Sequence, residues 1–229
     1  MHDLPEMDKI ISENGGMAMK ITKKVKTCGC CGKCFEGLIV NSCYRGDYGL
    51  DNKPMQKDGY PLVEQCPDCG YCGFSIEKQV SEEIRETVKS EEYKKILEAG
   101  GENQDIYRLQ AMLLLTDDLE QESYIHLLLC WIYEEEQKKV EALKERKTAA
   151  SQMEKEFEEK PSVLVEQMMI YIDCLRQLGE WEQAKTVVED IGEDIQEHFN
   201  LKHLIRRIFE FEKKAIEIQD TAPHSIREV

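Results

Sequence analysis

Long hydrophobic runs are absent from this sequence. It contains no stretch of about 18 consecutive apolar residues, the length from which a membrane-spanning helix is built. Its first twenty residues are acidic and lack the apolar core that a secretory signal needs. We therefore expect a cytoplasmic protein that does not enter the membrane.

Arrangements of catalytic residues are missing as well. The sequence shows no Ser/His/Asp or Cys/His combination for nucleophilic catalysis and no glycine-rich loop for phosphate. Histidine is scarce, and the five present have no metal-ligand spacing: His2, His126, His198, His203 and His224. We therefore assign no catalytic residue and no cofactor-binding residue beyond a metal site, and we expect a protein that is not an enzyme.

Positive charge is in short supply, because 30 Lys and Arg face 46 Asp and Glu, giving a net charge of −16. The imbalance is uneven along the chain. Residues 20–80 hold nine basic and seven acidic side chains, whereas residues 81–229 hold 20 and 35. The chain thus changes character near residue 80, and its acidic part would repel a phosphate backbone.

Cysteine, in contrast, is abundant. Eight of the ten cysteines lie between Cys28 and Cys72, and in a cytoplasmic chain such a cluster favours metal binding over disulfides. The segments CGCCG and CPDCG form two Cys-x-x-Cys turns with 34 residues between them. Four thiolates are the ligand set of a tetrahedral zinc ion. The sequence therefore predicts one structural zinc, bound by Cys28, Cys31, Cys66 and Cys69.

Other cysteine pairs have the same spacing, so the choice of ligands needs a reason. A glycine follows Cys31 and Cys69, and a sharp turn there lets backbone N–H groups point at the sulfur atoms. Phe35 follows Cys34, so the pair Cys31 and Cys34 lacks its glycine. Gly73 does follow Cys72, so the second choice is closer, and Pro67 favours Cys66 and Cys69. The weak internal repeat CGCCGKCF and CPDCGYCGF also aligns the chosen ligands with one another. The remaining thiols of the cluster are Cys30, Cys34, Cys43 and Cys72.

Two other metal assignments remain open. Rubredoxins also bind iron through two Cys-x-x-Cys-Gly turns, and several aromatic residues lie near these turns, which would suit electron transfer. A cluster of two metal ions that uses the remaining thiols is the second alternative. A catalytic zinc is disfavoured, because four thiolates leave no open coordination position and the histidines lie outside residues 20–80.

Helical patterns replace strand patterns after residue 80. Ser81 and Ser90 are placed as N-caps, and a helical break is expected after Tyr133, where the apolar stripe ends in EEEQKK. The hexapeptide GEWEQA, which starts at Gly179, has the spacing of a tetratricopeptide turn. An unrelated helical bundle is the alternative. Cys130 and Cys174 lie on apolar helix faces and should be buried.

The segments VKTCGCCGKCFE, YPLVEQCPDCGYCGF, LLLCWIYEEE and LGEWEQA together resemble a bacterial family of uncharacterised proteins, a domain of unknown function. Members of that family join an N-terminal zinc ribbon to tetratricopeptide-like helices. The resemblance covers most of residues 20–195, and its matching cysteines are Cys28, Cys31, Cys66 and Cys69. It implies this architecture and no reaction. One departure is that EEEQ stands here where such families place a Gly-Asp turn.

The sequence thus predicts an α+β fold that is predominantly α-helical. We expect a flexible lead-in over residues 1–19, a zinc ribbon over 20–80 and an antiparallel, tetratricopeptide-like helical domain over 81–229. The expected function is that of a non-enzymatic adaptor that binds an unidentified protein partner. The alternatives are a ribbon associated with nucleic acid, suggested by Lys20, Lys23, Lys24, Lys26 and Lys33, and a rubredoxin-like or thiol redox protein.

Overall fold

The computed structural model describes residues 9–11, 19–40, 46–56, 60–61, 63–160, 164–197 and 203–229. Most of the predicted lead-in, together with Cys43 and His198, lies outside these ranges.

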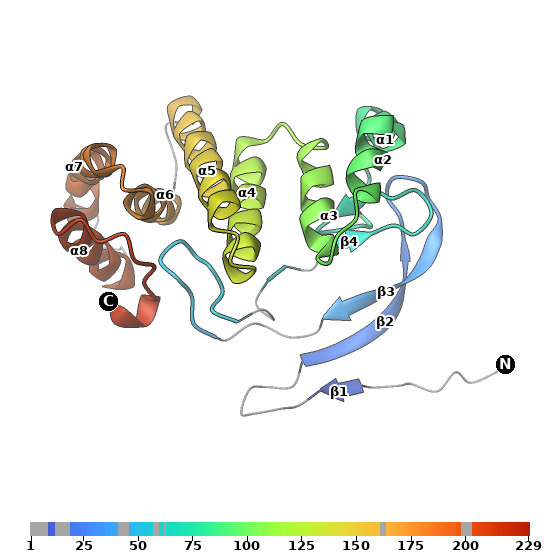
Figure 1. Ribbon diagram of the computed structural model, residues 1–229, viewed down its shortest axis with the longest axis horizontal. Helices are drawn as coiled ribbons and strands as arrows, with labels where there is room; N and C mark the ends of the chain where they lie inside the picture. Colours follow the sequence, from blue (N-terminus) through green and yellow to red (C-terminus); the bar gives the residue numbers. More distant parts are fainter. Residues whose placement is uncertain are drawn as a thin grey trace. The chain divides into compact units, whose positions relative to one another are not determined.

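The described residues are predominantly helical, as predicted, with short antiparallel strands near the N-terminus (Figure 1). The strands are β1 (Lys9–Ile11), β2 (Met19–Thr27), β3 (Cys34–Val40), β4 (Glu64–Gln65) and β5 (Cys72–Gly73). The helices are α1 (Glu82–Lys89), α2 (Glu91–Glu98), α3 (Gln104–Leu113), α4 (Leu119–Glu135), α5 (Lys139–Glu159), α6 (Val165–Leu178), α7 (Trp181–Glu197) and α8 (His203–Glu217).

The chain forms two compact units, each with its own internal contacts. The ribbon unit consists of Met1–Arg45 and Pro61–Leu115, and the helical unit consists of Gly46–Tyr60 and Thr116–Val229. This division differs from a boundary at residue 80 in two ways. Helices α1 to α3 belong with the strands, and the segment Gly46–Tyr60, which lies within the predicted ribbon of residues 20–80, belongs with α4 to α8.

In the ribbon unit, the strands form two antiparallel hairpins. Strands β2 and β3 pair from Ile21↔Val40 to Thr27↔Cys34, and β1 adds to the other edge of β2. Strands β4 and β5 pair through Gln65↔Cys72. Each hairpin loop, residues 28–33 and residues 66–71, therefore contains one of the Cys-x-x-Cys turns.

Helices α1 to α3 complete the ribbon unit. The Ser81 and Ser90 side chains accept hydrogen bonds from the backbone N–H groups of Ile84 and Tyr93, which confirms both predicted N-caps. The buried residues of these helices pack against the cysteine turns in one core. Its members are Cys28, Cys30, Cys66, Tyr71, Ile76, Val88, Tyr93 and Ala111.

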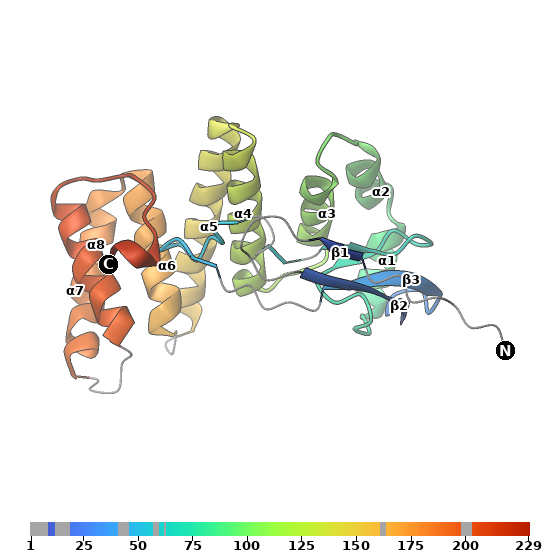
Figure 2. The same ribbon diagram turned by 90° about the horizontal axis from the view of Figure 1, so that it is seen from below.

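In the helical unit, α4 packs along α5, α6 packs against α5 and α8, and α7 packs against α6 and α8 (Figure 2). The predicted break after Tyr133 is confirmed, because α4 ends at Glu135 and α5 begins at Lys139. Gly179 ends α6 in the left-handed conformation, as expected, with φ of 76°. Cys130 and Cys174 are both fully buried, also as expected.

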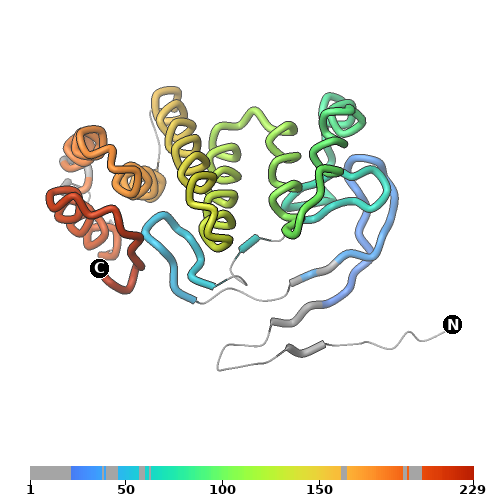
Figure 3. Tube along the Cα trace, in the orientation of Figure 1, coloured from blue at the N-terminus to red at the C-terminus, as the bar shows by residue number. Residues whose placement is uncertain are grey.

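The segment Gly46–Tyr60 is attached to the helical unit by buried polar contacts. Asp51 accepts hydrogen bonds from Trp131 Nε1 at 3.0 Å and from Arg146 at 2.9 Å. Leu50 N donates to the carbonyl oxygen of His224, so the C-terminal segment lies along the same stretch (Figure 3). This segment is thus held by hydrogen bonds in addition to the buried side chain of Leu50 and the stacking of Tyr60 on Trp131.

Within the ranges that the structure describes, no helix has the length and apolar character needed to cross a membrane.

Candidate metal centre

The two Cys-x-x-Cys turns have the same backbone geometry. Gly32 N donates to Cys28 O at 2.8 Å in the first turn, and Gly70 N donates to Cys66 O at 3.0 Å in the second. Both glycines take a positive φ, 76° and 79°, a conformation that a residue with a Cβ adopts at a cost. The sharp turn predicted at these two glycines is therefore confirmed.

The four predicted ligands lie together. The Sγ atoms of Cys28, Cys31, Cys66 and Cys69 are all within 4.8 Å of one another. Across the two turns, the sulfur of Cys28 is 3.8 Å from that of Cys69, and the sulfur of Cys31 is 3.8 Å from that of Cys66. A tetrahedral ion with metal–sulfur bonds of about 2.3 Å separates its ligands by about 3.8 Å. This cluster could hold one metal ion.

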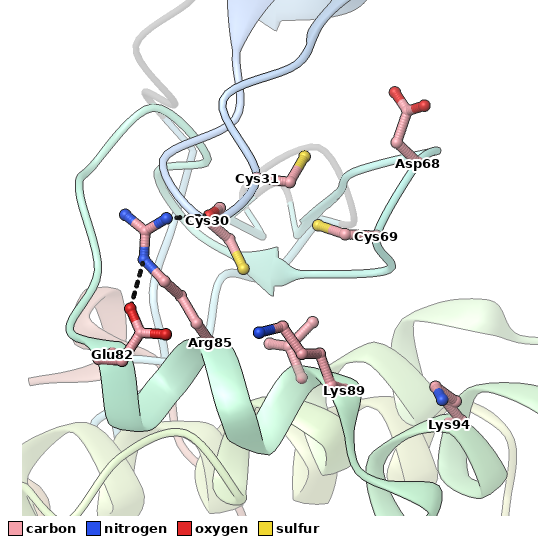
Figure 4. Close-up of a pocket in the computed structure, with 9 residues that line it drawn as sticks. Cys30, Cys31, Asp68, Cys69, Glu82, Arg85, Lys89 and Lys94 are labelled. Carbon is pink, nitrogen blue, oxygen red and sulfur yellow. Dashed lines mark hydrogen bonds and ion pairs between the residues drawn. The ribbon is translucent and has the colours of Figure 1, made fainter.

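The ligands differ in exposure. Cys28 and Cys66 are buried in the core at 0% and 1% exposure, whereas Cys31 is exposed and Cys69 is partly exposed. One edge of the cluster is therefore covered by the core, and the opposite edge faces a cavity of about 500 Å³. The cavity is lined by Cys30, Cys31, Asp68, Cys69, Glu82, Arg85, Val88, Lys89 and Lys94 (Figure 4).

Helices α1 and α2 fix the positions of the two turns. Arg85 in α1 donates to the carbonyl oxygen of Cys30 at 2.6 Å in the first turn. In the second turn, the Tyr93 hydroxyl from α2 accepts from Cys72 N at 3.0 Å and donates to Gly70 O at 3.2 Å. Each turn is thus held by a side chain that lies beyond the predicted end of the ribbon.

A close backbone contact and an ion pair add to this support. Gly29 N donates to Ile76 O at 2.8 Å. A Cβ at Gly29 would lie 1.9 Å from the Lys78 carbonyl oxygen, so the approach requires glycine. Lys33 from the first turn pairs with Asp68 of the second at 2.8 Å. The first turn is therefore held to the backbone near Ile76 and to the second turn by contacts outside the four cysteines.

The thiol pKa values follow from burial and hydrogen bonding. Burial raises the pKa of Cys28 to about 11 and raises the pKa of Cys69 above its usual range. Burial also acts to raise the pKa of Cys31, but the backbone N–H of Lys33 and the neighbouring thiols outweigh it and lower that pKa. A metal must displace protons from these thiols, so its affinity should fall as the pH falls.

The remaining cysteines of the ribbon lie in three different environments. Cys30 is buried beside the cluster, and burial raises the pKa of its thiol. Cys72 is buried, and its thiol donates to Gly70 O at 3.3 Å. Cys34 is exposed, with its sulfur 3.4 Å from Thr27 Oγ1. Among the described residues, the group that could hold a metal includes none of these three.

The histidines of the described ranges serve other contacts. His126 lies 2.5 Å from Glu145 between α4 and α5, and His224 lies between Asp220 and Glu228 at 2.8 and 2.7 Å. His203 is exposed at the start of α8. Within the part of the chain that the structure describes, the potential metal ligands contain no histidine.

The lysines near the first turn have carboxylate partners. Lys23 pairs with Glu36 at 2.6 Å, and Lys24 lies 3.8 Å from Glu77. Lys26 is buried and pairs with Glu64. The side chain of Lys20 lies outside the described set.

Comparisons with known proteins add no assignment, because no family model, curated protein or solved structure matches this chain.

Sequence reasoning missed the second layer of residues around the cluster. Arg85 and Tyr93 were read as parts of a separate helical domain, and Cys30 was grouped with the other remaining thiols. The one available signal was the short spacing between the second turn and Ser81, which leaves α1 little room to move away.

Proposed function

We propose that this chain is a non-enzymatic zinc-binding protein in which a structural zinc organises the ribbon unit. The observation that carries the proposal is the group of four cysteine sulfurs within 4.8 Å of one another. Four thiolates occupy all four positions of a tetrahedral ion, which leaves none for substrate or water. Zinc is the metal that we propose, because four cysteines are a common ligand set of structural zinc sites; iron bound by the same two turns is the alternative.

We further propose that the helices of the helical unit form a tetratricopeptide-like array. Helices α4, α6 and α8 are each followed by a residue with positive φ, namely Gln137, Gly179 and Gln219. The residue after each of these donates its N–H to a carbonyl five residues earlier: Lys138 to Tyr133, Glu180 to Leu175 and Asp220 to Ala215. The same helix ending recurs every 40 to 42 residues, longer than the 34 of a standard tetratricopeptide.

These repeated endings favour the resemblance to the bacterial family with a zinc ribbon and tetratricopeptide-like helices. Gln137 takes the left-handed conformation at the point where the family places a Gly-Asp turn. The chain therefore keeps a turn between α4 and α5, although its sequence there is EEEQ and not Gly-Asp. We propose that this chain is related to that family, and the proposal is based on the turn at Gly179 and on the two cysteine turns.

The proposed role is that of a cytoplasmic adaptor that binds another protein. Residues 116–229 hold 15 basic and 27 acidic side chains, so a partner with a basic or mixed surface would be attracted. Binding of nucleic acid is disfavoured, because Lys23, Lys24 and Lys26 lie near carboxylates that compete with phosphate. A repeat array of helices commonly presents an extended binding surface.

Two titrations test the choice between protein and nucleic acid. We expect no binding of random-sequence DNA or RNA at about 0.15 M salt, where exposed charges are screened beyond roughly 8 Å. Micromolar binding that weakens steeply with salt, and that is lost in the Lys23→Glu/Lys24→Glu protein, would contradict the proposal. Lys26 is left unchanged in this variant because it is buried against Glu64.

Affinity capture of the tagged full chain from its native cell, followed by mass spectrometry, addresses the partner itself. We expect one or a few proteins to be enriched, and to remain bound after nuclease treatment. A matched capture with the Cys66→Ser protein separates partners of the ribbon unit from partners of the helical unit. Loss of all enriched proteins on nuclease treatment would favour the nucleic-acid alternative.

A further inference from the structure

Cys30 marks a difference between two turns that are otherwise alike. The internal repeat aligns Cys30 in the first turn with Asp68 in the second. Asp68 lies near the surface and pairs with Lys33 at 2.8 Å. Cys30, in contrast, is 6% exposed and belongs to the core that surrounds the cysteine cluster. A thiol has therefore been placed beside the metal site, at a position where the other turn carries a carboxylate.

The Cys30 side chain lies on the same side of the cluster as one particular ligand. Cys30 and Cys69, which belongs to the opposite turn, line the same cavity, and Cys69 packs against the core that contains Cys30. Figure 4 shows the Cys69 side chain extending toward Cys30 within the cavity. Arg85 holds the Cys30 carbonyl at 2.6 Å and so fixes the backbone of this residue. The cluster therefore has a fifth sulfur that is not needed for a tetrahedral ion.

The cavity gives small molecules access to this side of the cluster. Cys30, Cys31 and Cys69 line the cavity of about 500 Å³. The other two ligands, Cys28 and Cys66, are covered by the core at 0% and 1% exposure. A small polar oxidant would therefore meet Cys31 or Cys69 first. These two sulfurs are thiolates when a metal is bound, and the thiolate is the reactive form.

Backbone geometry limits which ligand Cys30 can join. Cys30 and Cys31 are consecutive, with Cα atoms about 3.8 Å apart, whereas disulfides usually bridge Cα atoms about 4.4–6.8 Å apart. A bond between neighbours in sequence is thus disfavoured. Cys69 has no such restriction, because it comes from the other hairpin and lines the same cavity as Cys30.

We propose that hydrogen peroxide oxidises Cys30 and Cys69 to a disulfide, and that this reaction releases the bound metal ion. The inference rests on the metal site of the proposed function. It adds a chemical modification site that neither a structural zinc nor an adaptor role requires.

The reaction balances with the peroxide as the two-electron oxidant. The Cys69 sulfur attacks the peroxide, the O–O bond breaks, and Cys69 becomes a sulfenic acid while the first oxygen leaves as water. The Cys30 sulfur then attacks the Cys69 sulfur, the S–O bond breaks, and the second oxygen leaves as water. The two water molecules need two protons beyond those of the peroxide. One comes from the Cys30 thiol. The other comes from solvent, because Cys69 reacts as a thiolate.

The product keeps the two hairpins joined. Cys28, Cys31 and Cys66 remain as three ligands, which is too few for a closed structural zinc site. The new sulfur–sulfur bond links the first turn to the second, as the ion did before. A dithiol reductant should therefore restore the four ligands and allow the metal to bind again.

The test uses the full-length, zinc-loaded protein with hydrogen peroxide. Zinc content is measured first, then zinc release is followed with a colorimetric chelator, and disulfides are mapped by alkylation and mass spectrometry. We expect zinc release to coincide with a crosslinked peptide pair containing Cys30 and Cys69, and dithiothreitol with added zinc to reverse both. A disulfide map in which Cys30 stays a free thiol after zinc release would overturn the inference, as would retention of zinc.

Variants separate the role of Cys30 from general oxidation of the ligands. In Cys30→Ser protein, or in Cys30→Ala if the serine variant does not bind zinc, the crosslink is lost and dimedone should trap more sulfenic acid at Cys69. Cys34→Ser, which alters an exposed thiol away from the cluster, should behave as the unchanged chain. Equal dimedone labelling in all three proteins contradicts the inference. Absence of zinc at the first step counts against the proposed function, while the disulfide map still decides on the Cys30–Cys69 pair.

Discussion

The ribbon unit and the helical unit are stabilised in different ways. In the ribbon unit, a small core of buried residues surrounds four cysteines that could share one metal ion. In the helical unit, packed helices enclose charged side chains that pair with one another, such as Arg146 with Asp51. The four cysteines could bind a ligand from outside the chain, whereas the pair of Arg146 and Asp51 is formed by the chain alone.

The stability of the two units should therefore depend on different conditions. A small module folded around zinc responds to the supply of metal and to oxidants. Buried ion pairs respond to pH and to loss of either partner, because an unpaired buried charge is strongly unfavourable. Each kind of dependence can be tested in one unit with the other as an internal control.

Removal of the metal should have the largest effect. Structural zinc sites contribute about 10–16 kcal/mol of binding free energy, comparable to the whole stability of a typical domain, about 5–15 kcal/mol. We expect a chelator to increase amide hydrogen exchange in β2, β3 and α1 to α3, while α4 to α8 stay protected. Unchanged protection of α1 to α3, or equal loss in both units, would show that the units do not differ as described.

Loss of one ligand should have nearly the same effect as the chelator. Cys66→Ser should abolish stoichiometric zinc binding, because three thiolates remain and Cys66 is buried at 1% exposure. Cys34→Ser and Cys72→Ser are the matched controls and should retain one zinc per chain, although Cys72→Ser loses a buried thiol contact. Zinc loss in the Cys72→Ser protein would show that the second turn binds metal through other cysteines than assigned.

A buried arginine tests the helical unit. Arg146 is 3% exposed and donates to Asp51 at 2.9 Å and to Glu134 at 2.8 Å. Arg146→Met should lower the free energy of unfolding of the helical unit by about 3–5 kcal/mol, because Asp51 is left buried without its partner. Urea unfolding checks the magnitude, and metal content should not change.

The control for this variant is Arg227→Met, which alters an exposed arginine 3.4 Å from Asp47. Its effect should stay within about 1 kcal/mol, as for other exposed ion pairs. An effect of Arg146→Met no larger than that of the control would mean that the buried pair does not hold Gly46–Tyr60 in place.

The stability of the helical unit should also depend on pH. This effect should be smaller than that of the Arg146 substitution, and its sign follows from the pKa of Glu212. Burial, with Asp173 nearby, raises the pKa of Glu212 from 4.5 to about 9. Between these values the folded state keeps a proton that the unfolded state has lost, so this residue makes stability fall as the pH rises through that range. Glu212→Gln should reduce the fall between about pH 5 and pH 8. Parallel stability curves for the two proteins would contradict this assignment.

Some of these features could be predicted from the sequence because their cause is local. The two glycines after Cys31 and Cys69, the serine caps of α1 and α2, and the turn at Gly179 each depend on residues within a few positions. The break after α4 was also predictable, since its apolar stripe ends where charged residues begin. The coarse fold and the grouping of four cysteines follow from such local signals.

Other features depend on single contacts between distant residues. Asp51 and Tyr60 join the helical unit through Trp131, Arg146 and Glu135, which lie 75 to 95 residues further along the chain. The hydroxyl of Tyr93 binds the second cysteine turn from a helix expected in another domain. Apart from the short spacing between the second turn and Ser81, no periodicity or spacing reveals such pairs, so the attachment of Gly46–Tyr60 to the helical unit and the position of Cys30 were not predictable.

Metal analysis of the purified full-length chain decides whether the four cysteines bind zinc. Their sulfur atoms lie within 4.8 Å of one another and can supply all four ligands of one ion. We predict one zinc ion per chain, no iron, and a colourless solution. A red protein with iron and thiolate charge-transfer bands would contradict the account, and so would a folded ribbon unit that contains no metal.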